Sequence, residues 1–307
     1  MANINTALLR EAVLEAAWIQ WHALGTRLHA ERSAHTMVDP EALLLVSLAL
    51  HHHEKRLWDV LASWAQHGSK LFSLQRIKNL QKSYPQSVKV RVTQFAYRAR
   101  DEGNDFRWRS LVGSNAGAEA RTQDLLLGYP LKWHPAALMV RMRLGFGIGL
   151  GSDLLSYLIS QGGEWVSARQ AAEATGYSVY ALRRAADEIV AAQFIESTGG
   201  KPVQYRARME EWGSLIEVEH PPPGWRFWHQ VYAFAANLIL ADEGGDWDDL
   251  SNYLLSTQLR DLFEMHQDVF ALNHLDLLHP EKLPGEDILP AMEVAVKNLA
   301  EWITKQV

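Results

Sequence analysis

The spacing of apolar residues along the chain predicts a mainly α-helical protein. Apolar residues recur every three or four positions in residues 8–17, 57–64 and 290–305, which is the spacing of one helix face. Asp39-Pro40-Glu41 is typical of a helix start, because Asp accepts hydrogen bonds from free amides and Pro is tolerated in the first turn. Residues 42–50, which follow, are apolar on nearly all sides, so we expect this helix to be buried.

Two stretches do not fit a single pattern. Residues 87–100 begin with alternating valines, as in a strand, and continue with a sequence compatible with a helix, so both alternatives remain open. Residues 111–150 begin with a small, polar segment and end in alternating glycines. We interpret this second stretch as a loop or linker that contains one helix, at 136–144, and a hinge.

Residues 152–208 carry the most specific pattern in the sequence. An apolar-periodic helix and a short β-like triplet come first, followed by two helical patterns split by Thr175-Gly176-Tyr177-Ser178. Phe194-Ile195 then predicts a strand, Gly199-Gly200 a tight hairpin turn, and an alternating segment a second strand. The predicted order is helix, strand, helix, turn, helix, strand, turn, strand.

The second helix after the triplet divides into two faces. Its apolar stripe, which we expect to face the core, consists of Val179, Leu182, Ala186 and Ile189 or Val190. The residues left on the outer face are Ser178, Tyr180, Arg183, Arg184 and Asp187. In the hairpin, Val203 and Tyr205 alternate with polar and basic residues, and Lys201 stands at the tip.

This order of elements resembles the winged-helix transcription regulators, broadly those of the MarR, ArsR and AbiEi-antitoxin types. The resemblance covers residues 152–208 and implies a homodimer that binds double-stranded DNA at a palindromic site. In such a module the second helix lies in the major groove and reads base edges near its N-terminus. The DNA contacts expected from the module are Ser178, Tyr180, Arg183, Arg184, Lys201, Arg206 and Arg208.

The charge of the chain is unevenly distributed. Residues 1–208 hold 25 basic and 18 acidic residues, a balance of +7, whereas residues 209–307 hold 5 and 18, a balance of −13. Within the basic part, residues 70–109 contain ten basic residues and three acidic ones, interleaved with aromatics. Clustered cations bind phosphates, so we expect a second DNA-contacting surface here. The alternative is a solvated face that pairs with the acidic region. The contacts expected from this surface are Arg76, Lys78 and Lys82.

The composition of the chain limits which other functions and cellular locations we expect. The chain has no cysteine, which excludes disulfides and thiolate chemistry and fits a reducing, cytoplasmic compartment. We expect no signal peptide and no membrane span. His51-His52-His53 would point to different sides of a helix, about 100° apart, so we interpret them as surface residues and expect no metal site. No catalytic motif orders the remaining residues, so we expect neither an enzyme nor a cofactor.

Together these patterns predict three parts: a helical, basic N-terminal domain at 1–110, a winged helix with a small β-hairpin at 151–208, and an acidic helical domain at 221–307. Residues 111–150 would link the first two. The predicted function is sequence-specific DNA binding by a homodimeric transcription regulator, a repressor. The C-terminal helices would dimerise or bind a protein or small-molecule effector. The alternative is an adaptor subunit that uses the winged helix for protein contacts.

Overall fold

Helices make up most of the molecule, and a small antiparallel sheet of three strands accompanies them in the part of the chain that is described. The computed structural model describes residues 6–27, 32–112, 134–215, 221–245, 247, 249–275 and 282–307. Within these residues, no helix combines the length and the apolar character that a membrane span needs.

One group of helices surrounds α2 (Pro40–Leu50), all of whose residues are buried. As predicted, the carboxylate of Asp39 starts this helix by accepting a hydrogen bond of 3.0 Å from the amide of Ala42. We call this group the helical lobe. Its other α-helices are α1 (Ala7–Ala23), α3 (Lys55–Ser63), α4 (Leu74–Leu80), α5 (Gln86–Asp101), α11 (Trp228–Glu243), α12 (Asn252–Met265), α13 (Asp268–Leu272) and α14 (Ile288–Gln306).

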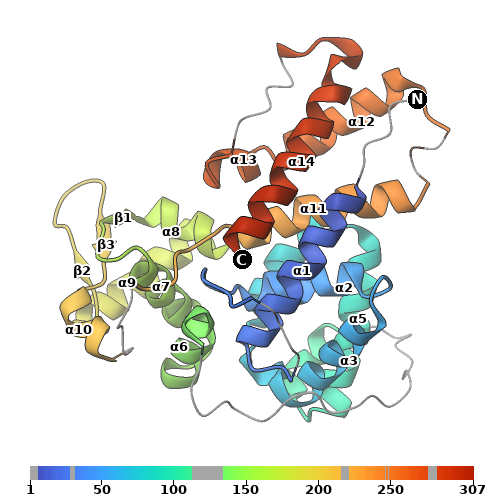
Figure 1. Ribbon diagram of the computed structural model, residues 1–307. Helices are drawn as coiled ribbons and strands as arrows, with labels where there is room; N and C mark the ends of the chain where they lie inside the picture. Colours follow the sequence, from blue (N-terminus) through green and yellow to red (C-terminus); the bar gives the residue numbers. More distant parts are fainter. Residues whose placement is uncertain are drawn as a thin grey trace.

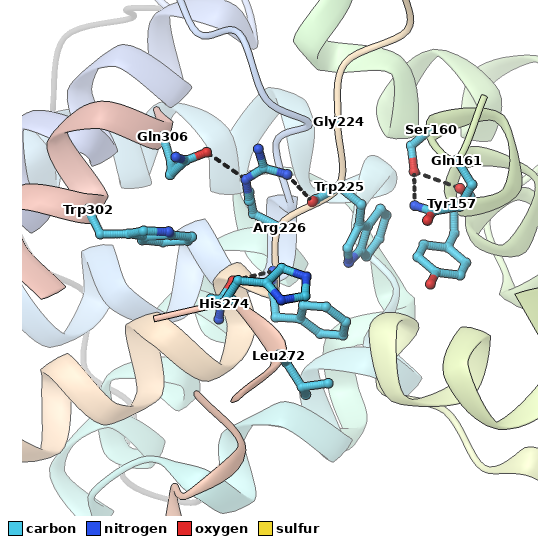
Figure 2. Close-up of a pocket in the computed structure, with 12 residues that line it drawn as sticks. Tyr157, Ser160, Gln161, Gly224, Trp225, Arg226, Leu272, His274, Trp302 and Gln306 are labelled. Atoms are coloured by element: carbon cyan, nitrogen blue, oxygen red, sulfur yellow. Dashed lines mark hydrogen bonds between the residues drawn. The ribbon is translucent and has the colours of Figure 1, made fainter. Parts of the chain in front are cut away.

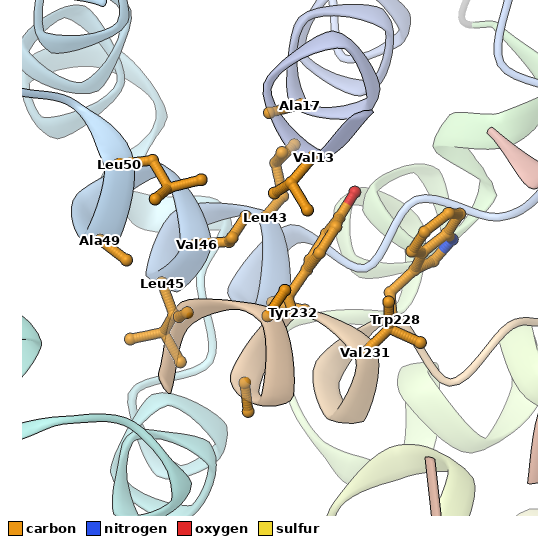
Figure 3. Packing of buried hydrophobic residues seen from close by; sticks show 14 of the residues in the cluster. Val13, Ala17, Leu43, Leu45, Val46, Ala49, Leu50, Trp228, Val231 and Tyr232 are labelled. Carbon is orange, nitrogen blue, oxygen red and sulfur yellow. The ribbon is translucent and has the colours of Figure 1, made fainter. Parts of the chain in front are cut away.

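The two ends of the chain share the core of this lobe. Figure 1 shows α11 and α14, in orange and red, beside the blue α1 and α2. Close up, Val13 of α1, Leu43 and Val46 of α2, and Val231 and Tyr232 of α11 gather in one apolar cluster (Figure 3). The helices expected as an acidic domain at 221–307 therefore bury their apolar faces against the N-terminal helices and share one core with them.

The open alternative at residues 87–100 is resolved as a helix, α5. Val88, Val92 and Phe95 are buried and lie four and three residues apart, whereas Val90 between them is 55% exposed. Val90 therefore does not share the buried face of Val88 and Val92. The helical spacing of the larger apolar residues determines this segment, because it is the spacing that buries them together.

A second group of elements, which we call the HTH (helix-turn-helix) lobe, contains the segment predicted as a winged helix. Its elements follow in the predicted order, and α6 and α10 are added at the two ends. They are α6 (Leu138–Phe146), α7 (Leu150–Ser160), β1 (Val166–Ser167), α8 (Ala168–Thr175), α9 (Val179–Ala191), β2 (Glu196–Ser197), β3 (Gln204–Arg206) and α10 (Met209–Leu215). The sheet order is β1-β3-β2, with Tyr205 of β3 opposite Val166 on one side and Ser197 on the other.

Two predicted boundaries in this lobe are wrong. The first hairpin strand is Glu196–Ser197, because the amide of Phe194 still donates to Ile189 O at the end of α9. The expected linker at 111–150 is also too long. Its first part, 113–133, lies outside the described residues, but α6 packs in the core of the HTH lobe. A short connection at Gly147, with a φ of +86° that favours glycine, then joins α6 to α7.

Candidate nucleic-acid interface

The turn between α8 and α9 has the local geometry of a helix-turn-helix. Ser167 and Gln170 form a capping box at the start of α8. Gly176 ends α8 in the left-handed conformation, with a φ of 73°. The hydroxyl of Ser178 then accepts a hydrogen bond of 3.2 Å from the amide of Ala181 and begins α9. The expected outward contact Ser178 is thus a helix cap, and it remains exposed.

The outer face of α9 is open, and its inner face is in the core. Leu182 and Ala186 are buried, as the predicted stripe requires. Tyr180, on the opposite side, is 81% exposed. Arg183 and Arg184 are exposed as well. Among the described residues, Arg184 forms only an exposed ion pair of 3.7 Å with Glu188 of the same helix. These three side chains are therefore accessible in the first two turns of α9.

The hairpin presents one accessible cation. Lys201 is exposed and forms no hydrogen bond or ion pair with the described residues. Arg206 is held by Glu196 at 2.6 Å and lies over the ring of Trp165. Arg208 donates to Gln193 O at 2.8 Å and also pairs with a glutamate of α10. Arg206 and Arg208 therefore stabilise the hairpin and are less available to DNA than predicted.

Arg76 is not available to DNA, and its prediction as a contact is wrong. The side chain is fully buried and donates to both carboxylate oxygens of Asp39, to Glu41 at 2.7 Å and to Thr175 O at 2.7 Å. Lys78, on the same helix, is half-buried and donates to a serine hydroxyl at 3.1 Å. Lys82, just beyond the helix, is exposed.

The rest of the predicted basic surface is also smaller than its sequence indicates. Arg91 donates to the last carbonyls of α2, and Arg98 is buried over the ring of Trp58. Arg107 pairs with Asp105 at 2.6 Å. These three arginines therefore stabilise the helical lobe, because each contacts a carbonyl group, an aromatic ring or a carboxylate within it. The exposed or half-exposed cations that remain are Lys70, Lys78, Lys82, Lys89, Arg109 and Arg100, the last of which pairs with the adjacent Asp101.

A buried ionic network joins the two lobes, and sequence reasoning missed it. Arg143 of α6 binds Glu41 of α2 at 2.6 Å and Asp153 of α7 at 2.7 Å. Arg76 of α4 extends the network through its own bonds to Asp39 and Glu41. The five charged side chains are at most 2% exposed.

The same network reaches the turn between α8 and α9. The hydroxyl of Tyr177 donates to Asp153 at 2.9 Å and lies 3.0 Å from the hydroxyl of Ser73, which starts α4. The amide of Asn79 in α4 donates to Gly176 O at 3.1 Å. Because α4 thereby holds the turn, the network and these bonds fix the HTH lobe on the helical lobe.

Burial and charge together set the ionisation of the network. Burial by itself raises the pKa of Asp39, but the charge and hydrogen bonds of Arg76 outweigh it and leave the pKa below the ordinary value. Burial also raises the pKa of Tyr177, and the neighbouring charge of Asp153 adds to the effect. The carboxylate of Asp39 is therefore charged and the Tyr177 hydroxyl stays a donor.

One visible signal of this network was present in the sequence. Asp39-Pro40-Glu41 indicates a helix start, yet Glu41 lies in the first turn of a helix that is apolar on nearly all sides and is buried with it. A buried carboxylate needs a cationic partner. Which arginine supplies it depends on tertiary packing, since Arg143 lies 102 positions further along the chain.

A cluster of histidines lies elsewhere, at the end of α2. His52 and His53 are in the turn after the helix, not on it, and their Nε2 atoms lie 3.1 and 2.7 Å from the two carboxylate oxygens of Glu243. The three ligand atoms are close enough to share one metal ion. However, Arg10 also pairs with Glu243, and Arg91 lies 3.4 Å from Nδ1 of His52. Two arginines beside one carboxylate disfavour a further cation.

Comparison with known proteins adds no relative. No family model, no curated protein and no solved structure matches this chain. The function must therefore be inferred from the geometry of the described residues.

Proposed function

We propose that this chain is a transcription regulator that binds double-stranded DNA as a homodimer and acts as a repressor in the cytoplasm. In this proposal α9 lies in the major groove and the β2–β3 hairpin contacts the phosphate backbone, as in a winged helix. The absence of cysteine is in keeping with a cytoplasmic site of action.

The outer face of α9 is the observation that carries the proposal. Tyr180, Arg183 and Arg184 are exposed in the first two turns of a helix whose opposite face is fixed in a core. Arginine can bind guanine through two hydrogen bonds, and tyrosine can contact a phosphate or a thymine methyl group. Two arginines and a large aromatic ring exposed at this place therefore favour contact with a DNA groove.

The position of α4 adds a second support. Asn79 touches the turn at Gly176 O, and Lys82 follows Asn79 by three residues, which places both on one side of the same helical segment. Lys82 therefore lies about one helical turn, roughly 5 Å, from the point where Asn79 contacts the connection between α8 and α9. Phosphates beside the groove that holds α9 would be within reach of this lysine and of Lys201 at the hairpin.

A binding titration tests the proposal. The full chain would be titrated onto DNA from upstream of its own gene, with fluorescence anisotropy as the readout and salt as the second variable. The double variant Arg183→Gln/Arg184→Gln should bind at least about 10-fold more weakly, since each base contact contributes about 1–3 kcal/mol. Lys201→Gln should lower the dependence of log K on log salt by about 0.9, the contribution of one phosphate.

A matched control removes two charges elsewhere. Lys297 and Lys305 of α14 are exposed, so Lys297→Gln/Lys305→Gln changes the net charge equally without touching the HTH lobe. The control should retain wild-type affinity and salt dependence. If Arg183→Gln/Arg184→Gln bound DNA as tightly as the wild type, α9 would be ruled out as the helix that contacts the bases.

The adaptor function is the second candidate, and one observation favours it. Phe146 and Phe194 are 45% and 44% exposed, and their rings lie 5.8 Å apart and pack against Trp212. Exposed aromatic clusters of this kind often mark protein contacts. Failure to bind any DNA even at low salt, in a folded chain, would favour this function over the first.

A further inference from the structure

A pocket of about 610 Å³ lies between the HTH lobe and the helical lobe (Figure 2). Its walls come from the end of α7, from residues 224–227 that lead into α11, and from the ends of α13 and α14. Its volume falls within the range of small-molecule sites in proteins, about 300–1,000 Å³. None of the residues proposed for DNA contacts lines it.

Arg226 brings a positive charge to this pocket, and none of the described residues pairs it with a carboxylate. Its Nε donates to the side-chain oxygen of Gln306 at 2.7 Å, and its Nη1 donates to Trp225 O at 2.8 Å. Both acceptors are neutral, and Arg226 forms no ion pair with the residues described in the structure. The side chain is half-buried, and this burial lowers the pKa of its guanidinium. A half-buried cation with neutral neighbours favours an anion as its ligand.

Aromatic rings provide part of the other walls, beside polar residues such as Gln161 and Asn273. Figure 2 shows Arg226 between the indole rings of Trp302 and Trp225, with Tyr157 beyond Trp225. The rings of Tyr157 and Trp225 meet edge to face at 5.1 Å. The indole Nε1 of Trp225 is buried and has no hydrogen-bond partner among the described residues. A flat ring can therefore pack beside these rings.

The number of charges limits the class of anion. A phosphate carries nearly two negative charges and is usually bound by several donors or cations, whereas Arg226 is the one Lys or Arg side chain among the lining residues. A carboxylate carries one charge and matches the planar fork of a single guanidinium. The surrounding rings favour an apolar, flat body attached to that carboxylate.

We propose that this pocket binds a small aromatic carboxylate. The carboxylate is held by the guanidinium of Arg226, and the ring of the ligand packs against Trp225 and Trp302. The proposal goes beyond DNA binding and does not depend on it, because its test contains no DNA.

The test is a titration of the full chain with benzoate and with indole-3-acetate, measured by calorimetry and, for benzoate, also by tryptophan fluorescence. We expect saturable binding of at least one of them, and binding at least about 10-fold weaker for its neutral amide analogue, benzamide or indole-3-acetamide. The amide comparison needs no substitution and so carries no risk of misfolding. Inorganic phosphate at the same concentrations should not compete.

Substitutions then place the ligand. Arg226→Gln should weaken binding at least about 10-fold, and Arg226→Lys should bind with intermediate affinity because it retains the charge but not the fork. Arg260→Gln is the matched control, since Arg260 also donates to backbone carbonyls, at Leu283 and Gly285, but does not line the pocket. It should bind like the wild type.

Three results would overturn the proposal. They are the absence of saturable binding of both carboxylates up to about 10 mM, equal affinity of the wild type and a folded Arg226→Gln variant, and competition by phosphate at equal concentration. The last result would assign the pocket to simple anions. DNA binding remains measurable separately in each of these cases.

Discussion

The replacement Arg76→Met tests the buried network most directly. Arg76 donates to Asp39, to Glu41 and to Thr175 O, and no part of its side chain is exposed. Methionine fills a similar volume but donates no hydrogen bond. The variant therefore leaves three buried carboxylates, those of Asp39, Glu41 and Asp153, with one cation, Arg143, in place of two.

The expected loss of stability is large. Removal of one partner of a buried ion pair costs about 3–5 kcal/mol, because the other charge stays buried without compensation. A protein of ordinary stability has about 5–15 kcal/mol in total. For a chain of 307 residues, the melting temperature should fall by about 5–8 °C.

The pH dependence gives the effect a signature. In the wild type the pKa of Asp39 lies below its ordinary value, so Asp39 contributes stability above the unfolded pKa, and this is lost as pH falls through the folded pKa. In the variant, burial remains and Arg76 is gone, so the pKa of Asp39 rises above the unfolded value. The variant then loses stability as pH rises through that raised pKa. The difference between the two proteins should be larger at about pH 7 than at about pH 4.

Urea unfolding followed by circular dichroism measures both effects. Lys78→Met is the matched control, because Lys78 lies on the same helix and donates to a single serine hydroxyl. It should change the free energy of unfolding by no more than about 0.5 kcal/mol. If Arg76→Met is as stable as this control, or if its deficit does not change with pH, the account of the network is wrong.

Three further predictions follow from the described contacts. Gly176→Ala should lower the free energy of unfolding by about 1–2 kcal/mol in thermal unfolding, because φ is +73° and the added Cβ would lie 2.9 Å from Leu80. The control Gly199→Ala, which has open space around the added Cβ, should be near neutral. Burial lowers the pKa of His229 to about 4, so unfolding in urea should show up to about 3 kcal/mol of stability lost as pH falls from about 6.5 to 4, and His229→Gln should reduce that loss. Deletion of residues 221–307 should leave an unfolded chain by circular dichroism, since it removes part of the shared core; a folded, soluble fragment would contradict that core.

Local patterns in the sequence predicted much of the secondary structure. The cap at Asp39, the left-handed Gly176 and the cap at Ser178 stand where their residue types indicate, because each depends on neighbours within three positions. The apolar stripe of α9 likewise predicted which side is buried, with Leu182 and Ala186 in the core. The outward position of Tyr180 and Arg183 follows from the same periodicity.

The burial of individual basic side chains could not be predicted from such local patterns. Arg76 and Lys78 look alike in the sequence, two cations two positions apart on one short helix, yet one is fully buried and the other is not. The difference depends on Asp39 and Glu41, which α2 places against α4. A count of basic residues in 70–109 therefore overestimates the surface that can meet phosphates.

The sequence by itself determined most of the helices, their caps and the order of elements from 152 to 208, because these depend on spacing and on backbone preferences within a few residues. Only the tertiary structure decided that 221–307 closes the core begun by α1 and α2, and that two arginines from α4 and α6 neutralise carboxylates far away in the chain. Burial of a charge is favourable only beside its partner, and partners separated by a hundred residues meet only when the fold brings them together.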